Sequence, residues 1–203
     1  ERRNRKVELI SDLKEALKNK GILFTMIMFF LIQVCVMLLQ PLITMYVGQL
    51  MGQVNDEAVQ MAGVIFSLAG ISGILAAPFW GKRGQRYGYV KTFCYITFGA
   101  GVVNLLQFFT TDVYQFAVVQ FIYGLFLAGA IPNINANLAE VTDKSIRGKA
   151  FGLVTSAQMS GGFVGPLLGG ALGYFLPTKL VIISTGIILI SVAGYTYLKK
   201  VKA

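Results

Sequence analysis

Long apolar segments alternate with short polar segments along almost the whole chain. Six of the apolar segments approach or exceed the ~20 residues that an α-helix needs to cross a hydrocarbon layer of ~30 Å. They run approximately from Ile22 to Val47, Ala58 to Trp80, Thr92 to Phe109, Val113 to Ala139, Ala150 to Phe175 and Leu180 to Leu198. The pattern predicts an all-α integral membrane protein with six transmembrane helices, spans 1 to 6.

The polar segments share the positive charges unevenly. Of 203 residues, 18 are Lys or Arg and 9 are Asp or Glu. With six spans, 17 of the 18 basic residues fall on one face, and Lys179 falls on the other. The positive-inside rule makes the basic face cytoplasmic, with both termini of this segment on that side. The net charge of +9 therefore reflects membrane topology, and no nucleic-acid partner is expected.

The segment before span 1 has a different character. Val7, Ile10, Leu13 and Leu17 are spaced three, three and four residues apart among charged residues, which predicts an amphipathic helix or a plain solvated linker helix. We expect three parts: a cytoplasmic linker (1–20), a transmembrane domain (21–198) and a cytoplasmic tail (199–203). The chain opens with ERRNR rather than methionine, so we expect it to be the second part of a longer membrane protein.

Groups able to catalyse a reaction are scarce. The chain has no histidine, and Cys35 and Cys94 fall within spans, where small buried apolar roles suit them. The span interiors contain no Asp, Glu, Lys or Arg, and Glu140 lies only at the end of span 4. We therefore expect no enzyme activity, no cofactor and no metal site.

Neutral polar residues do occur within the spans. Gln33 and Gln40 are seven residues apart in span 1, and Asn133 and Asn137 are four apart in span 4. Each pair would share one helix face, where it could line a cavity or form hydrogen bonds between helices. For the polar residues of the other spans, packing is the favoured role.

Span 5 contains the segment SGGFVGPLLGG. Gly161, Gly165, Gly169 and Gly173 recur every four residues and form a surface without side chains, here called the glycine ridge, where a second backbone can approach closely. Pro166 cannot donate to the carbonyl of Gly162, so we expect a bend or local unwinding there.

Three motifs carry a resemblance to a known family. The spacing of Gly161, Gly165, Pro166, Gly169 and Gly170 resembles the antiporter signature of the major facilitator superfamily. A second stretch, GKRGQRYGYVK from position 81, is similar to the family's loop motif G-x-x-x-D-R-x-G-R-[RK]. It matches at Gly81, Arg86, Gly88 and, one residue displaced, Lys91; Gln85 and Tyr89 depart from it. RGKAFG from position 147 is similar to the family's RG-x-A-x-G segment.

The resemblance implies the carboxy-terminal half of a twelve-helix transporter from the drug/proton antiporter branch. Its partners would be the missing amino-terminal six-helix half, the lipid bilayer, small amphipathic substrates and protons, in a plasma membrane, such as a bacterial inner membrane. Spans 1 and 4 would line a central cavity, and spans 2 and 5 would meet the other half. The expected cavity residues are Gln33, Met37, Gln40, Phe126, Asn133 and Asn137. The expected conformational motif is Gly81, Arg86, Gly88, Gly161, Gly165, Pro166, Gly169 and Gly170.

Two alternatives remain open. The same fold could carry a sugar, a peptide or another metabolite, which ligand binding would distinguish. A six-span scaffold without transport activity would also tolerate glycine-rich spans, although the combined motifs favour a transporter.

Overall fold

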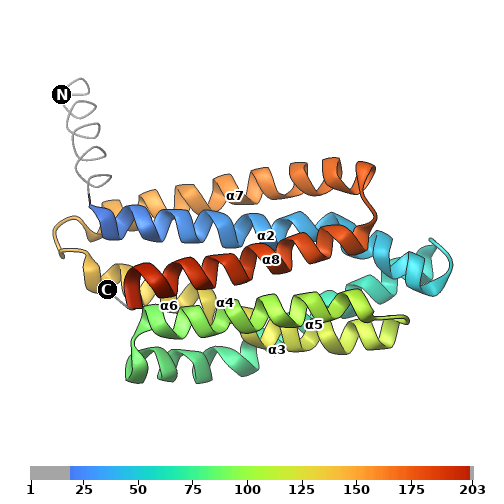
Figure 1. Ribbon diagram of the computed structural model, residues 1–203, viewed down its shortest axis with the longest axis horizontal. Helices are drawn as coiled ribbons and strands as arrows, with labels where there is room; N and C mark the ends of the chain where they lie inside the picture. The colour runs from blue at the N-terminus through green and yellow to red at the C-terminus, as the bar shows by residue number, and fades with distance from the viewer. Residues whose placement is uncertain (1–18, 202–203) are drawn as a thin grey trace.

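The computed structural model of the protein describes residues 19–201, all organised around helices running nearly side by side (Figure 1). No strand occurs in these residues. The helices are α2 (Lys20–Met51), α3 (Asp56–Tyr87), α4 (Tyr89–Leu106), α5 (Val113–Leu127), α6 (Ala130–Val141), α7 (Arg147–Phe175) and α8 (Thr178–Thr196). The short helices η1 (Gln107–Phe109) and η2 (Tyr197–Val201) extend α4 and α8. The amphipathic helix predicted before span 1 falls almost entirely outside the described residues.

The predicted all-α membrane fold is confirmed. Helices covering spans 1, 2, 3, 4 and 6 are long and apolar enough to cross a membrane. Span 5 corresponds to α7, whose 29 residues are long enough to cross a membrane. The chain crosses the bundle back and forth, so α2 begins at the same end at which α3, α6 and α8 finish (Figure 1).

Local sequence signals explain where these helices begin. The Asn19 side chain accepts a hydrogen bond from the Gly21 amide at 2.9 Å, which caps α2. Asn55 caps α3 and Asp112 caps α5 in the same way. At the far end of α2, Gly52 takes a φ of 72°, a left-handed conformation that favours glycine. The polar connections seen in the sequence are therefore helix caps and tight turns.

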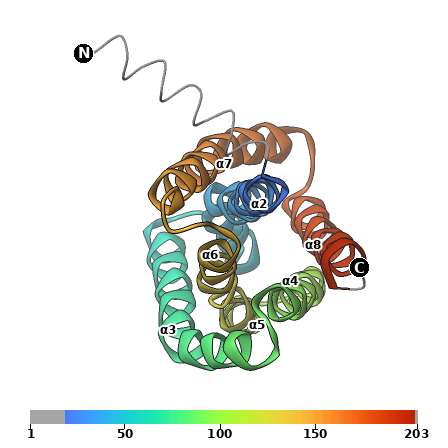
Figure 2. The same ribbon diagram turned by 90° about the vertical axis from the view of Figure 1, so that its left-hand side faces the viewer.

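The helices pack in three main pairs, α2 with α7, α3 with α5, and α4 with α8. Viewed from the end where α2 begins, α2 and α6 lie near the middle, with α3, α7, α8 and α4 around them (Figure 2). No Cα pair of α3 and α7 lies within 8 Å, so these two helices leave one side of the bundle open.

Polar side chains join some of the pairs. Asn104 of α4 donates from Nδ2 to Thr185 Oγ1 of α8 at 2.7 Å, and Gln107 donates from Nε2 to Gln120 Oε1 of α5 at 2.8 Å. All four side chains are buried. The packing role expected for Asn104 and Gln107 is confirmed.

Spans 4 and 5 differ from expectation in where the helix is interrupted. A bend or local unwinding was expected at Pro166, and the unwinding does not occur, because α7 continues unbroken from Arg147 to Phe175. Gly165 and Gly169, on either side of Pro166, both pack against α2, which holds this part of α7 in place. Span 4 is the one that breaks, into α5 and α6 at Ala128 and Gly129.

Candidate functional site

A cavity of about 490 Å³ lies in the bundle, open toward the gap between α3 and α7. Its floor comes from α2 and α5, while α3 and α7 contribute its sides. Apolar side chains and glycines make up most of its surface. The polar residues that line it are all neutral: Gln33, Gln40, Gln120, Tyr123 and Gln158.

The break in span 4 forms one wall of this cavity. Pro132 has no amide hydrogen for the carbonyl of Ala128, so one hydrogen bond of the helical ladder is missing at this point. The Gly129 amide instead donates to the Phe126 carbonyl at 3.2 Å, which leaves the Leu125 carbonyl without its helical donor. Ala128 and Leu127, at the break, both line the cavity.

Trp80 of α3 stabilises the break from outside. Its indole Nε1 donates to the freed Leu125 carbonyl at 2.7 Å, so this carbonyl is satisfied within the membrane. A Cβ on Gly129 would lie 2.5 Å from Trp80 Cβ, which shows why glycine is needed at this close approach. The break therefore depends on residues of two spans, on Gly129 in span 4 and on Trp80 in span 2.

The polar residues of the cavity differ in how fully they are paired. Gln158 of α7 donates from Nε2 to Gln33 Oε1 of α2 at 3.3 Å, linking two sides of the cavity. The side chain of Gln120 accepts a hydrogen bond from Gln107 Nε2. Tyr123 is buried, and its hydroxyl has no hydrogen-bond partner among the described residues. A ligand or water in the cavity could therefore bond to this hydroxyl.

The structure separates the predicted cavity residues into two groups. Gln33, Met37 and Gln40 of α2 line the cavity. Phe126, in contrast, packs on Gly99 of α4 with its ring centroid 5.8 Å from that of Trp80. Phe126 is therefore part of the packing around the break and does not line the cavity.

The two asparagines of α6 also lie away from the cavity. Asn133 is 1% exposed and donates from Nδ2 to the Gly129 carbonyl at 2.8 Å and to the Trp80 carbonyl at 3.4 Å. Asn137 borders only a small gap near Phe24 and Tyr89. Their predicted place on the cavity is wrong, because Asn133 and Asn137 lie on another face of α6 than Ile131, which does line the cavity. Of the two roles that the sequence left open, Asn133 has the hydrogen bond between helices.

Sequence reasoning did not include three cavity residues, Gln120, Tyr123 and Gln158. Gln120 and Tyr123 are three residues apart in α5 and so share a helix face, a signal that was available in the sequence. The position of Gln158 depends on how α7 is rotated against α2, and no spacing within span 5 reports that rotation.

The close approach predicted at the glycine ridge is confirmed, but its partner is different. A Cβ on Gly161 would lie 2.7 Å from the Phe30 carbonyl oxygen, and one on Gly165 would lie 2.7 Å from Met37 Cβ. A Cβ on Gly169 would overlap the Leu38 carbonyl oxygen. All of these partners belong to α2, so the ridge joins spans 1 and 5 within this bundle. The prediction that the ridge meets another half is therefore wrong for Gly161, Gly165 and Gly169 in this structure. Gly170 differs, because a Cβ there would meet nothing within 4 Å.

The segment that resembles the family's loop motif is mostly helical. Gly81 and Arg86 belong to the last turns of α3, and α4 begins at Tyr89, so Gly88 alone forms the turn. Its φ of 90° explains the glycine. The Arg86 guanidinium lies 5.3 Å from the Tyr87 ring centroid, and Gly81 has no neighbour within 4 Å of a Cβ position. Gly84, not predicted, is buried against Asn133 and Tyr89.

Arg147, the first residue of the RGKAFG motif, connects α6 to α7. Its Nη2 donates to the Ala139 carbonyl at 2.7 Å and lies 3.5 Å from the Thr142 carbonyl oxygen. These carbonyls lie at the end of α6, where helical donors run out and a cation interacts favourably with the helix dipole. Arg147 thus caps one span from the first turn of the next.

These features define a class of protein, a multi-pass helical membrane protein built around a cavity that is open on one side. The chain belongs to the Major Facilitator Superfamily, whose sequence profile matches residues 25–202. Two relatives are both named Multidrug resistance protein MdtG. The protein from Yersinia enterocolitica serotype O:8 / biotype 1B is 33% identical over 136 residues, which are 66% of this chain and 32% of the relative. The protein from Escherichia coli O1:K1 / APEC is 32% identical over 136 residues, which are 66% of this chain and 33% of the relative. The chain thus matches about a third of the length of these relatives.

Proposed function

We propose that the chain is the carboxy-terminal half of a multidrug efflux transporter that exports amphipathic compounds in exchange for protons. The observation that carries the proposal is the cavity of about 490 Å³ with amide and phenol groups in an otherwise apolar wall. Pockets for drug-sized ligands usually have about 300–1,000 Å³ and this kind of lining. The names of the two bacterial relatives agree with such cargo.

The open side of the cavity supports a second half as the partner. The two helices on either side of the gap, α3 and α7, carry exposed apolar side chains, among them Ile74, Phe79, Met159 and Phe163. A matching six-helix half placed there would close the cavity and cover these side chains. Rocking of the two halves would then expose the cavity to each side of the membrane in turn.

The same proposal includes the parts of the chain, the membrane in which it lies and the location of the proton-carrying groups. Residues 1–20 form a cytoplasmic linker, 21–198 the transmembrane half and 199–203 a cytoplasmic tail, in a bacterial inner membrane. Proton coupling requires a titratable group, and the interiors of these spans contain no acid. The proton-carrying acids therefore belong to the other half. The activity is transport, without a covalent step.

The experiment measures dye export by the whole protein that carries this sequence, reconstituted in vesicles with an imposed proton gradient. We expect export of several chemically unrelated dyes to depend on the gradient. In the double variant Gln33→Leu and Gln40→Leu, dye affinity should fall about five- to 150-fold, because each of the two lost hydrogen bonds contributes about 0.5–1.5 kcal/mol. The matched control is Gln60→Leu, the same chemical change at an exposed position of α3 outside the cavity.

Two outcomes would count against the proposal. If the intact protein exports none of the dyes, a carrier for one narrow class of metabolite becomes the better explanation. If Gln60→Leu weakens dye binding as much as the double variant does, the cavity is not where the dye binds.

A further inference from the structure

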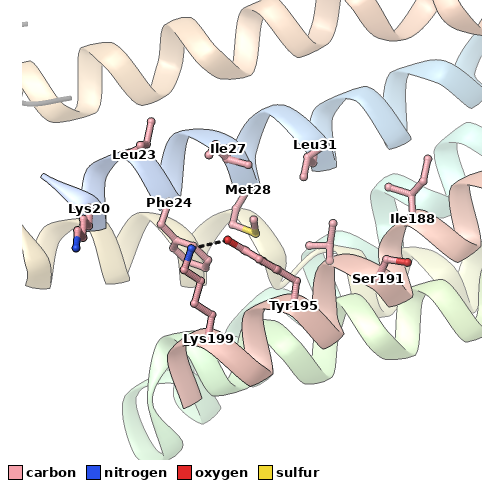
Figure 3. Close-up of a pocket in the computed structure, with 11 residues that line it drawn as sticks. Lys20, Leu23, Phe24, Ile27, Met28, Leu31, Ile188, Ser191, Tyr195 and Lys199 are labelled. Carbon is pink, nitrogen blue, oxygen red and sulfur yellow. Dashed lines mark hydrogen bonds between the residues drawn. The ribbon is translucent and has the colours of Figure 1, made fainter. Parts of the chain in front are cut away.

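A second and larger hollow, of about 680 Å³, lies outside the central cavity, between α2 and the helix formed by α8 and η2 (Figure 3). It arises because α2 packs mainly along α7 and α8 packs mainly along α4, so that α2 and α8 diverge. We call this hollow the α2–α8 groove. Its lining differs from that of the central cavity in both polarity and charge.

The α2–α8 groove is apolar along its length and basic at one end. Leu23, Ile27 and Leu31 line it from α2, and Ile188 and Val192 line it from α8. Lys20 and Lys199 lie at the end where α2 begins and η2 follows α8 (Figure 3). Lys199 Nζ donates to the Tyr195 hydroxyl at 2.7 Å, so this lysine is held at the end of the groove. Among the described residues, no acidic side chain lines the groove.

The length of the groove matches one leaflet of a bilayer. Lys20 and Leu31 are eleven residues apart in one helix, which corresponds to about 16 Å at 1.5 Å per residue. Half of a ~30 Å hydrocarbon layer is about 15 Å deep. With the lysines at the headgroup level, the apolar part of the groove therefore reaches about to the middle of the membrane.

We propose that the α2–α8 groove binds an anionic phospholipid of the leaflet at this end of the bundle. One acyl chain lies along Leu23, Ile27 and Leu31, and the phosphate lies between Lys20 and Lys199. Charge selects this occupant, because two ammonium groups attract a lipid with net negative charge and repel a lipophilic cation. The site requires only that the helices span a membrane and does not depend on what the protein transports.

The test uses native mass spectrometry of the whole protein that carries this sequence, with added phosphatidylglycerol or phosphatidylcholine. A basic residue near an anionic lipid contributes about fivefold to binding, so two should give a preference of roughly thirtyfold for phosphatidylglycerol. We expect the double variant Lys20→Gln and Lys199→Gln to lose this preference. The matched control, Lys82→Gln with Lys144→Gln, removes the same charge at exposed positions that do not line the groove and should keep it.

A groove-filling variant tests the acyl-chain part separately. Ile27→Trp adds a large side chain to the groove without changing any charge, and Ile27 is 45% exposed, so the helix can accommodate it. We expect this variant to lose phosphatidylglycerol binding while its melting temperature stays near that of the parent.

Three results would overturn the proposal. The intact protein could show no headgroup preference, as it would if residues 1–18 or a second copy of the chain filled the groove. Both double variants could lose the preference equally, which would make overall charge responsible. Ile27→Trp could bind phosphatidylglycerol as well as the parent does, which would place the lipid elsewhere.

Discussion

Adding one methyl group to the glycine ridge should loosen the packing of α2 against α7. Gly169 and Gly170 are neighbours in the same helix, but their surroundings differ completely. A Cβ on Gly169 would overlap the Leu38 carbonyl oxygen of α2, whereas a Cβ on Gly170 would meet nothing within 4 Å. Gly169→Ala and Gly170→Ala are therefore a matched pair that differs in packing and not in chemistry.

The size of the effect follows from this difference. Replacing glycine by alanine favours a helix by about 1 kcal/mol, and this gain is common to both variants, so it cancels in their difference. Overfilling a packed contact costs about 1–3 kcal/mol. The overlap at Gly169 is with backbone rather than with a side chain that could rotate away, so the helices must separate. We expect Gly169→Ala to be less stable than Gly170→Ala by about 2–3 kcal/mol.

The assay is the thermal unfolding of the whole protein in detergent, followed by the loss of monodisperse protein on size-exclusion chromatography. The melting temperature of Gly169→Ala should lie several degrees below that of Gly170→Ala. Equal melting temperatures, or a lower one for Gly170→Ala, would refute the assignment of the ridge to α2 and point to an interface on the opposite face of α7.

Three further tests concern other parts of the bundle. Asn104→Leu and Thr185→Val each remove one partner of a buried hydrogen bond between α4 and α8. A double-mutant cycle of unfolding should therefore show a coupling energy of about 0.6 kcal/mol, and at most about 1.7 kcal/mol. A coupling energy of zero would contradict that bond. Trp80→Phe should lower stability by about 1–3 kcal/mol, measured by thermal unfolding, because the Leu125 carbonyl then loses its donor within the membrane. Arg147→Gln should lower the melting temperature, since the charged cap of α6 is lost, and Arg147→Lys should recover part of the loss; no recovery would argue against a role for the charge.

The α2–α7 contact shows how far the glycine pattern could be interpreted. A four-residue glycine repeat in an apolar span predicts a close helix approach wherever it occurs, because the absence of side chains is a property of that helix alone. Which helix approaches depends on how α7 is rotated in the bundle. That rotation is set by contacts with residues more than 100 positions away, such as Leu38 and Met37. No spacing within span 5 contains this information.

The cavity was predictable in part for a related reason. Gln33 and Gln40 lie in one uninterrupted helix, so their seven-residue spacing keeps them on one face, and both line the cavity. Asn133 and Asn137 also share a face, but that face of α6 lies toward α3 and α4, while Ile131 of the same helix lines the cavity. Pro132 marked a weak point in span 4, but the position of the break also depends on Trp80 of another span.

The sequence by itself determined the membrane class, the approximate spans, the clustering of basic residues at one end and the motifs of the superfamily. These properties are sums over local stretches, since hydropathy and charge need no knowledge of distant contacts. Only the tertiary structure decided which helices pair, where span 4 breaks, which polar side chains face the cavity and that a basic-ended groove lies between α2 and α8. Those outcomes depend on the rotation and separation of helices, which the packing of side chains from distant spans settles together.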